Sequence, residues 1–96
     1  MGVTAKDIIR LKAQHPMLAE AFDLVLVSGL SGNKKRAYSM LGENERSTRW
    51  IAERLNLTIF HASTILKQLL DLTVVERKEV ITSEGRHFLW RCAGKG

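Results

Sequence analysis

The chain has 96 residues, 45% of them hydrophobic and 26% charged, which fits one soluble globular domain and excludes long disordered tracts. Its net charge is +5, and residues 33–96 carry this whole excess, with 12 basic and 7 acidic side chains. The excess predicts a polyanionic partner, nucleic acid first, with a merely soluble basic surface as the alternative. A single cysteine excludes an intrachain disulfide and a zinc framework, and no apolar run fits a signal peptide or a membrane span. We therefore expect a cytoplasmic protein without membrane anchor, metal or other cofactor.

Two short helices are predicted for residues 1–32. Thr4 is the expected N-cap of the first, with Asp7 three residues later in a capping-box pattern. Pro16 suits the first position of the second, although β-branched residues near its end leave a strand as the alternative. The apolar side chains of this segment are Ile8, Ile9, Leu18, Phe22, Val25 and Leu26. We expect residues 1–32 to cover the core or to form a dimer interface.

A third helix and a closely spaced helix pair follow. Gly42 ends the third helix, and residues 42–47 read as a polar connection. Ser47 and Thr58 are the expected N-caps of the pair, and Asn56 can take the left-handed conformation between them. The residues expected to face inward are Ile51, Ala52 and Leu55 in the first helix of the pair, and Ile59, Ala62, Leu66, Leu69 and Leu70 in the second. Small residues such as Ala52 and Ala62 allow two helix axes to cross closely.

Beyond residue 72 the apolar period changes from about 3.6 to 2. Residues 73–82 and 86–92 read as two strands joined by the turn "SEG", with Phe88 and Trp90 on one face. This pattern predicts a β-hairpin that rests on the helices. Residues 93–96 are expected to form a flexible tail.

The stretch "STRWIAERLNLTIFHASTILKQLLDLTVVERK…EGRHFLWR" resembles the winged helix-turn-helix domain of the ArsR and MarR groups of regulators and of small fimbrial regulators similar to PapI. The resemblance implies a mainly α fold with a small β-hairpin wing, in the order α-α-α-α-α-β-β, with the domain at residues 33–92. Asn56 and Thr73 stand where these families usually have glycine, and Ala62 replaces a β-branched residue. No cysteine pair matches a metal-sensing site, so metal sensing is not implied.

The polar side of the second helix of the pair, opposite its apolar face, holds the main candidates for DNA contact. Phe60 is the equivocal one, since it can contact a thymine methyl group or complete the core. Serine, threonine and arginine at the helix starts suit phosphate, and basic residues of the hairpin suit a minor groove. Ordinary capping and a solvated helix face are the alternative readings. The candidates are Ser47, Thr48, Arg49, Thr58, Phe60, His61, Ser63, Thr64, Lys67, Gln68, Lys78 and Arg86.

No arrangement of nucleophile, base or phosphate-binding glycine loop appears, so we expect no enzyme. The expected function is sequence-specific binding of double-stranded DNA by a homodimeric transcriptional regulator, with the helix of residues 58–72 in the major groove. The alternative is a winged-helix module for protein interaction, such as an adaptor or a phage- or plasmid-encoded modulator.

Overall fold

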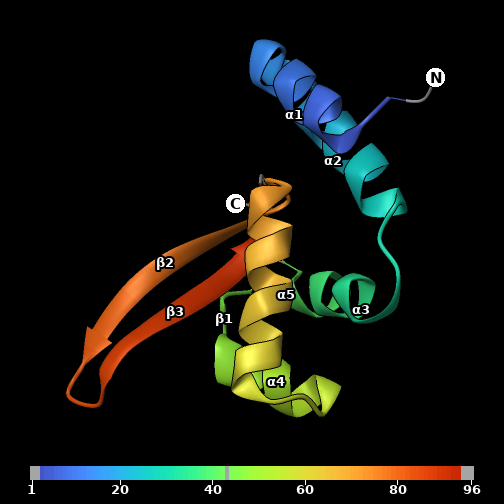
Figure 1. Ribbon diagram of the computed structural model, residues 1–96. Coiled ribbons are helices and arrows are strands. Elements are labelled where there is room, and N and C mark those ends of the chain that lie inside the picture. The colour runs from blue at the N-terminus through green and yellow to red at the C-terminus, as the bar shows by residue number, and fades with distance from the viewer. Residues whose placement is uncertain (1–2, 43, 94–96) are drawn as a thin grey trace.

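The computed structural model describes residues 3–42 and 44–93. This part of the chain forms helices and a three-stranded antiparallel sheet (Figure 1). The elements are α1 (Ala5–Gln14), a 3₁₀ turn (Pro16–Leu18), α2 (Ala19–Ser28), α3 (Gly32–Leu41), β1 (Arg46–Ser47), α4 (Thr48–Leu55), α5 (Ile59–Asp71), β2 (Val75–Thr82) and β3 (Gly85–Cys92). Of the tail expected at residues 93–96, all but Ala93 lies outside the described residues.

The first helix begins with the predicted capping box. Thr4 Oγ1 accepts a hydrogen bond from the backbone N–H of Asp7 at 3.3 Å, and the Asp7 carboxylate accepts one from the Thr4 N–H at 3.2 Å. This backbone hydrogen bond from Thr4 is the main reason why the pKa of Asp7 is lowered.

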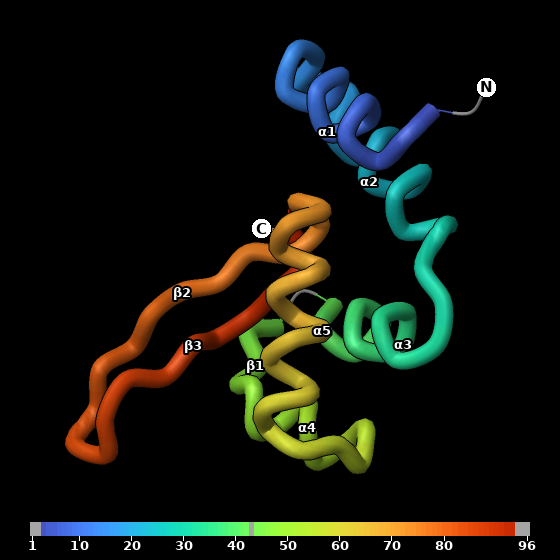
Figure 2. The backbone as a smooth tube through the Cα atoms, viewed as in Figure 1, coloured from blue at the N-terminus to red at the C-terminus, as the bar shows by residue number. Residues whose placement is uncertain are grey.

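The start of the second helix differs from the prediction. Pro16 opens a 3₁₀ turn in which the Leu18 N–H donates to the carbonyl of His15 at 2.9 Å, and α2 begins only at Ala19. The chain reverses direction between α1 and α2 (Figure 2), and a bond to the third residue back fits such a tight turn. From Ala19 onward the segment is helical to Ser28, so the strand alternative is wrong.

The caps of α4 and α5 and the turn between them form as predicted. Ser47 Oγ accepts from the Trp50 N–H at 3.0 Å, and Thr58 Oγ1 accepts from the His61 N–H at 3.1 Å. Asn56 has φ of 57° and ψ of 46°, the left-handed conformation that ends α4. Local side-chain chemistry therefore defines both helix starts.

Small side chains lie buried in both helices of the pair. Ala52 in α4 is 1% exposed and Ala62 in α5 is 0% exposed, and the Leu57 N–H donates to the Ala52 carbonyl across the turn at 2.9 Å. Their lack of bulk fits the close packing of α4 on α5.

The prediction that Ile59 of α5 faces the core is wrong, because Ile59 is 49% exposed. Ile59 belongs to the first turn of α5, which projects beyond the core. Ile65, which was not among the expected core residues, is buried instead. The buried positions follow the helical period, as Ala62, Ile65, Leu66 and Leu69.

A short third strand was not predicted. Residues 42–47 were expected to be a polar connection, but Arg46 and Ser47 form β1, which pairs antiparallel with β3. In this register Trp90 lies opposite Arg46 on one side and Arg77 on the other. The prediction failed because the edge of β3 offers unpaired backbone groups to whichever segment passes it, and that segment is set by the packing of α4.

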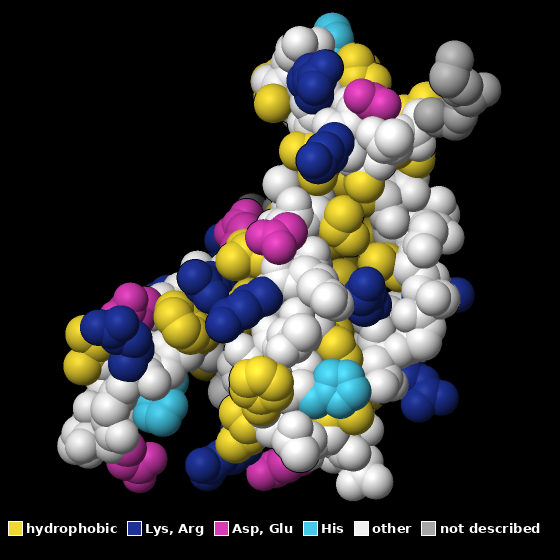
Figure 3. Space-filling model, in the orientation of Figure 1, with side chains coloured by type: hydrophobic (Ala, Val, Ile, Leu, Met, Phe, Trp, Pro, Cys, Tyr) yellow, Lys and Arg dark blue, Asp and Glu magenta, His cyan; other side chains and the backbone are white. Residues whose placement is uncertain are grey.

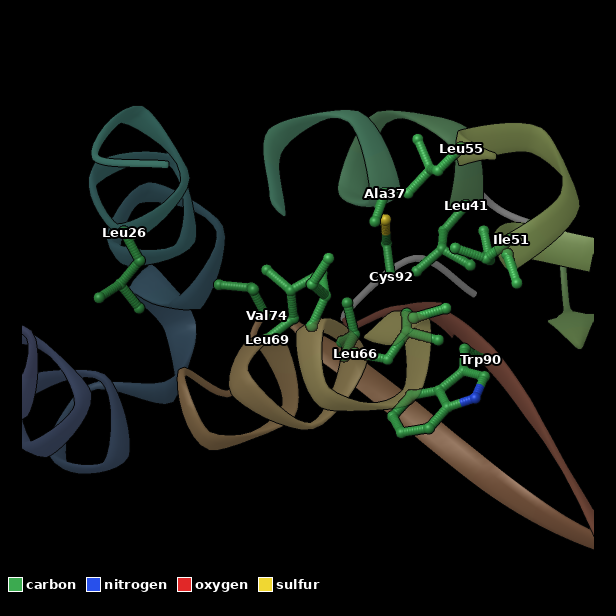
Figure 4. Close-up of a cluster of buried hydrophobic side chains, with 14 residues drawn as sticks. Leu26, Ala37, Leu41, Ile51, Leu55, Leu66, Leu69, Val74, Trp90 and Cys92 are labelled. Carbon is green, nitrogen blue, oxygen red and sulfur yellow. The ribbon is translucent and has the colours of Figure 1, made fainter. Parts of the chain in front are cut away.

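One hydrophobic cluster joins the helices and the sheet (Figure 4). Leu41 of α3, Ile51 of α4, Leu66 of α5 and Trp90 of β3 are each 0–1% exposed. Leu26 of α2 reaches this cluster from one side.

The N-terminal helices and the hairpin tip lie at opposite ends of the molecule (Figures 1 and 2). α1 and α2 lie beyond the C-terminal end of α5, whereas α4 and the β2–β3 turn lie near its N-terminal end. The first turns of α5 are therefore not covered by the described residues of the N-terminal segment.

Candidate functional site

A groove of about 430 Å³ lies between the N-terminal ends of α4 and α5 and the tip of the β2–β3 hairpin. Five of the predicted site residues meet there, although they come from three separate segments of the chain. The lining residues are Ser47, Thr48, Arg49, Ile59, Ser63, Glu84, Arg86, His87 and Phe88.

The polar side of α5 is exposed next to this groove. Figure 3 shows hydrophobic and basic side chains side by side over α5 and the hairpin. Phe60 is 83% exposed, which excludes the alternative that it completes the core. The predicted residues on this exposed side are Phe60, His61, Thr64, Lys67 and Gln68.

Lys78 is the predicted site residue that the structure separates from the groove. It lies opposite Leu89 in the sheet, whereas Arg86 lies opposite Ile81. Because neighbouring strand residues alternate between faces, Lys78 and Arg86 project from opposite faces of the hairpin. Lys78 lines a different hollow, of about 260 Å³, together with Glu45, Glu76, Arg77, Leu89 and Arg91.

Four of the five predicted hydroxyl groups form hydrogen bonds within the chain. Besides the two helix caps, Thr64 Oγ1 donates to the carbonyl of Phe60 at 3.1 Å, and Thr48 Oγ1 accepts from Trp90 Nε1 at 2.9 Å. The fifth, Ser63, is half-buried in the groove, and its hydroxyl makes no hydrogen bond among the described residues. Ser63 is therefore the hydroxyl best placed to bond a ligand.

Two arginines, Arg49 and Arg86, and one glutamate, Glu84, line the groove. Arg49 and Lys67 are exposed and form no ion pair with any described residue. Arg86 Nε lies 2.8 Å from Glu79 Oε1, but both side chains are substantially exposed, so water and salt weaken this pair. An approaching anion can compete with such a surface pair for the guanidinium.

Arg77 was not identified from the sequence as a residue that contacts aromatic rings of β3. Its guanidinium lies 4.4 Å from the ring centroid of Phe88 and 5.6 Å from that of Trp90. No pattern in the sequence reveals this contact, because it depends on the register of β2 against β3.

Two cation–π contacts with the ring of Trp50 in α4 were also not identified from the sequence. The guanidinium groups of Arg46 and Arg54 lie 4.4 Å and 4.7 Å from the ring centroid of Trp50. Arg54 lies four residues after Trp50 in α4, a helical spacing that predicts its contact, whereas Arg46 lies in β1 and its contact depends on the tertiary fold. The half-buried indole of Trp50 packs against the hydrophobic core.

Two further properties concern cofactors and membranes. Within residues 3–42 and 44–93, no group of three or more His, Cys, Asp or Glu side chains is arranged to hold a metal ion. No helix in the described part of the chain is long and apolar enough to cross a membrane.

No protein-family model matches the chain, and no curated protein matches it. Among solved structures, a MarR family regulator from Neisseria meningitidis is similar, with a TM-score of 0.54 and 19% sequence identity. The match covers 91% of this chain and 62% of the length of that regulator.

The chain has a winged helix-turn-helix fold. In this fold α4 and α5 are the two helices of the motif, and the β2–β3 hairpin is the wing. The expected fold class, mainly α with a small β-hairpin wing, is confirmed. The short strand β1 adds a third strand at the base of the wing.

Proposed function

We propose that this protein is a transcriptional regulator that binds double-stranded DNA with α5 in the major groove. The observation that carries the proposal is the uncovered side of α5, which lies beside a groove bordered by Arg49 and Arg86. The helix α5 has 13 residues and is about 20 Å long. The major groove is wide enough to hold an α-helix. The similarity to a MarR family regulator supports the same function.

Each element has a distinct expected role in this complex. The start of α4, with Ser47, Thr48 and Arg49, contacts phosphate through its N–H groups and the guanidinium. The exposed residues of α5, together with Thr58 and Ser63, contact base edges and flanking phosphates. Arg86 at the wing tip contacts the adjacent minor groove, and Lys78 reaches phosphate only from the outer face of the wing.

Binding measured across salt concentrations tests the proposal. DNA selected from a random pool should bind more tightly than unselected DNA, and binding should weaken steeply as salt rises. Arg49→Ala and Lys67→Ala should each reduce the salt slope by about one unit. Arg10→Ala and Lys6→Ala are matched controls at the other end of the molecule and should leave the slope unchanged. Equal slopes in all four variants would remove α5 and α4 from the interface.

A charge reversal gives a sharper test of the groove. Ser63→Glu places a carboxylate where a phosphate or base would lie and should abolish binding without unfolding the domain. Ser39→Glu, at an exposed residue of α3 outside both proposed interfaces, is the control and should bind as the wild type does. Retained affinity in Ser63→Glu would exclude this side of α5 from DNA contact.

We also propose that the protein is a homodimer joined through α1 and α2. The apolar side chains expected to form the interface differ in burial. Within the chain Leu26 is buried, and Ile8, Ile9 and Phe22 are half-buried. Leu18 and Val25 are exposed. The exposed apolar side chains of these helices are Leu11, Met17, Leu18, Leu24 and Val25. A second copy would bury them, and two copies would double the contacts with a near-palindromic site.

Light scattering after gel filtration tests the dimer at tens of micromolar chain. Leu24→Glu should convert the dimer to a monomer, because Leu24 is 72% exposed and a buried carboxylate at an interface is costly. Ile81→Glu, at a 75% exposed residue of the wing, is the matched control and should leave the dimer intact. A monomeric wild type would contradict the proposal.

A second candidate function is protein interaction through the same face. Phe60 and Ile81, both exposed, are side chains that a protein partner would also bury. This function predicts weak DNA binding without sequence preference, so the salt titration separates the two.

A further inference from the structure

The first two turns of α5 expose apolar side chains to solvent. Phe60 is 83% exposed, and the adjacent Ile59 is 49% exposed. Phe60 lies two residues before the fully buried Ala62, a rotation of about 200° around the helix, so its ring points away from the core. No described part of the chain covers this apolar surface.

Strong hydrogen-bonding base readers are missing from these two turns. Guanine is read by two bonds from Arg or Lys, and adenine by two bonds from Asn or Gln. On α5 such side chains first appear at Lys67 and Gln68, about 10 Å along the helix from Phe60. In a helix-turn-helix complex, however, the N-terminal residues of the second helix contact the bases.

Thr64 extends the apolar character of this surface. It lies four residues after Phe60, on the same side of the helix. Its hydroxyl donates to the Phe60 carbonyl at 3.1 Å, so its polar group is turned toward the helix backbone. The methyl group of Thr64 is then the part left for an external partner.

The surroundings of this apolar surface favour DNA over an apolar partner. Arg49 and Arg86 border the adjacent groove, and Lys67 follows one helical turn after Thr64. An apolar centre flanked by cations matches thymine, whose methyl group projects into the major groove between two rows of phosphates.

We infer that Phe60, together with Thr64, recognises the 5-methyl group of thymine, so that the preferred DNA site carries thymine opposite the first two turns of α5. This inference rests on the proposed function. Burial of one methyl group against Phe60 makes binding about fourfold tighter than with uracil, which lacks that group.

Uracil substitution tests the inference directly. Each thymine of the selected duplex is replaced in turn by deoxyuridine, and the dissociation constant is measured for the wild type and for Phe60→Ala. At one or two positions the wild type should bind the uracil duplex about fourfold more weakly. Phe60→Ala should bind the two duplexes equally, and Phe60→Leu should retain part of the difference.

A control variant and two further outcomes show whether the inference alone or also the proposed function is wrong. Val3→Ala removes an exposed apolar side chain, 67% exposed, before α1 and should retain the full preference for thymine. A wild type without any preference for the selected sequence would overturn the proposed function and this inference together. Sequence-specific binding in which uracil has no effect, or in which Phe60→Ala keeps the wild-type preference, would overturn the inference alone.

Discussion

Lys12 Nζ donates a hydrogen bond to the carbonyl oxygen of Thr73 at 2.8 Å and so ties α1 to the second residue after the end of α5. The same ammonium group contacts Thr73 Oγ1 at 3.1 Å and lies 2.7 Å from Asp23 Oδ1 of α2. The side chains of Lys12 and Asp23 are only 17% and 12% exposed. One cation therefore joins the N-terminal helices to the helix expected to bind DNA.

Replacing this cation should destabilise the fold. Lys12→Met leaves the Asp23 carboxylate without its counterion and is expected to lower the free energy of unfolding by about 2 kcal/mol, as measured by urea denaturation. Lys6→Met, on the exposed side of α1, is the control and should change the free energy of unfolding by less than about 0.5 kcal/mol. Adding Asp23→Leu to Lys12→Met should recover part of the loss. Equal free energies of unfolding for Lys12→Met and Lys6→Met would show that the ion pair contributes nothing to stability.

Thr73 adopts a backbone conformation that suits another residue better. Its φ is +63°, a value that a β-branched residue rarely takes, just after the C-terminal end of α5. Thr73→Asn relieves this strain and keeps a side-chain oxygen for Lys12, so it should raise the free energy of unfolding by about 1 kcal/mol. Thr82→Asn, within β2, should give no gain in the same thermal or urea unfolding experiment. A loss of stability in Thr73→Asn would contradict the expected strain.

The bond between Trp90 Nε1 and Thr48 Oγ1, 2.9 Å long, connects the base of the wing to the first turn of α4. Thr48→Val keeps the shape of the side chain but leaves the indole N–H without its acceptor, which should cost about 1 kcal/mol of unfolding free energy. Thr64→Val is the control, because its hydroxyl donates to a helical carbonyl and its loss should be nearly neutral. Both variants can be compared in urea by tryptophan fluorescence; equal stabilities would show that the bond does not support the wing.

Tyr38, the one tyrosine of the chain, should lose its proton at a higher pH than an ordinary tyrosine does. Burial, followed by the influence of the neighbouring Cys92, raises the pKa of Tyr38 from 10.0 to about 12. The folded chain then retains a proton that the unfolded chain loses, so the stability of the fold should fall as pH rises from about 10 to about 12. Tyrosinate absorbance should show a mainly neutral side chain at about pH 11 in the native protein and a mainly ionised one in urea. A native midpoint near 10 would contradict this.

Local features of the fold were correctly predicted from the sequence. The caps by Thr4, Ser47 and Thr58 depend on a side chain and a backbone group only three residues apart, and all three form. Asn56 ends α4 because its short polar side chain tolerates the left-handed conformation. The change of apolar period after residue 72 likewise predicts the hairpin without knowledge of the rest of the chain.

Other features depend on contacts between distant residues, which only the tertiary structure decides. The exposure of Ile59 and Phe60 depends on where the core ends along α5, and the separation of Lys78 from Arg86 depends on the register of the hairpin. The strand β1 exists because the packing of α4 brings Arg46 beside the edge of β3. A sequence pattern records which residues favour an element or a face, whereas packing and strand pairing determine which faces meet and which remain open.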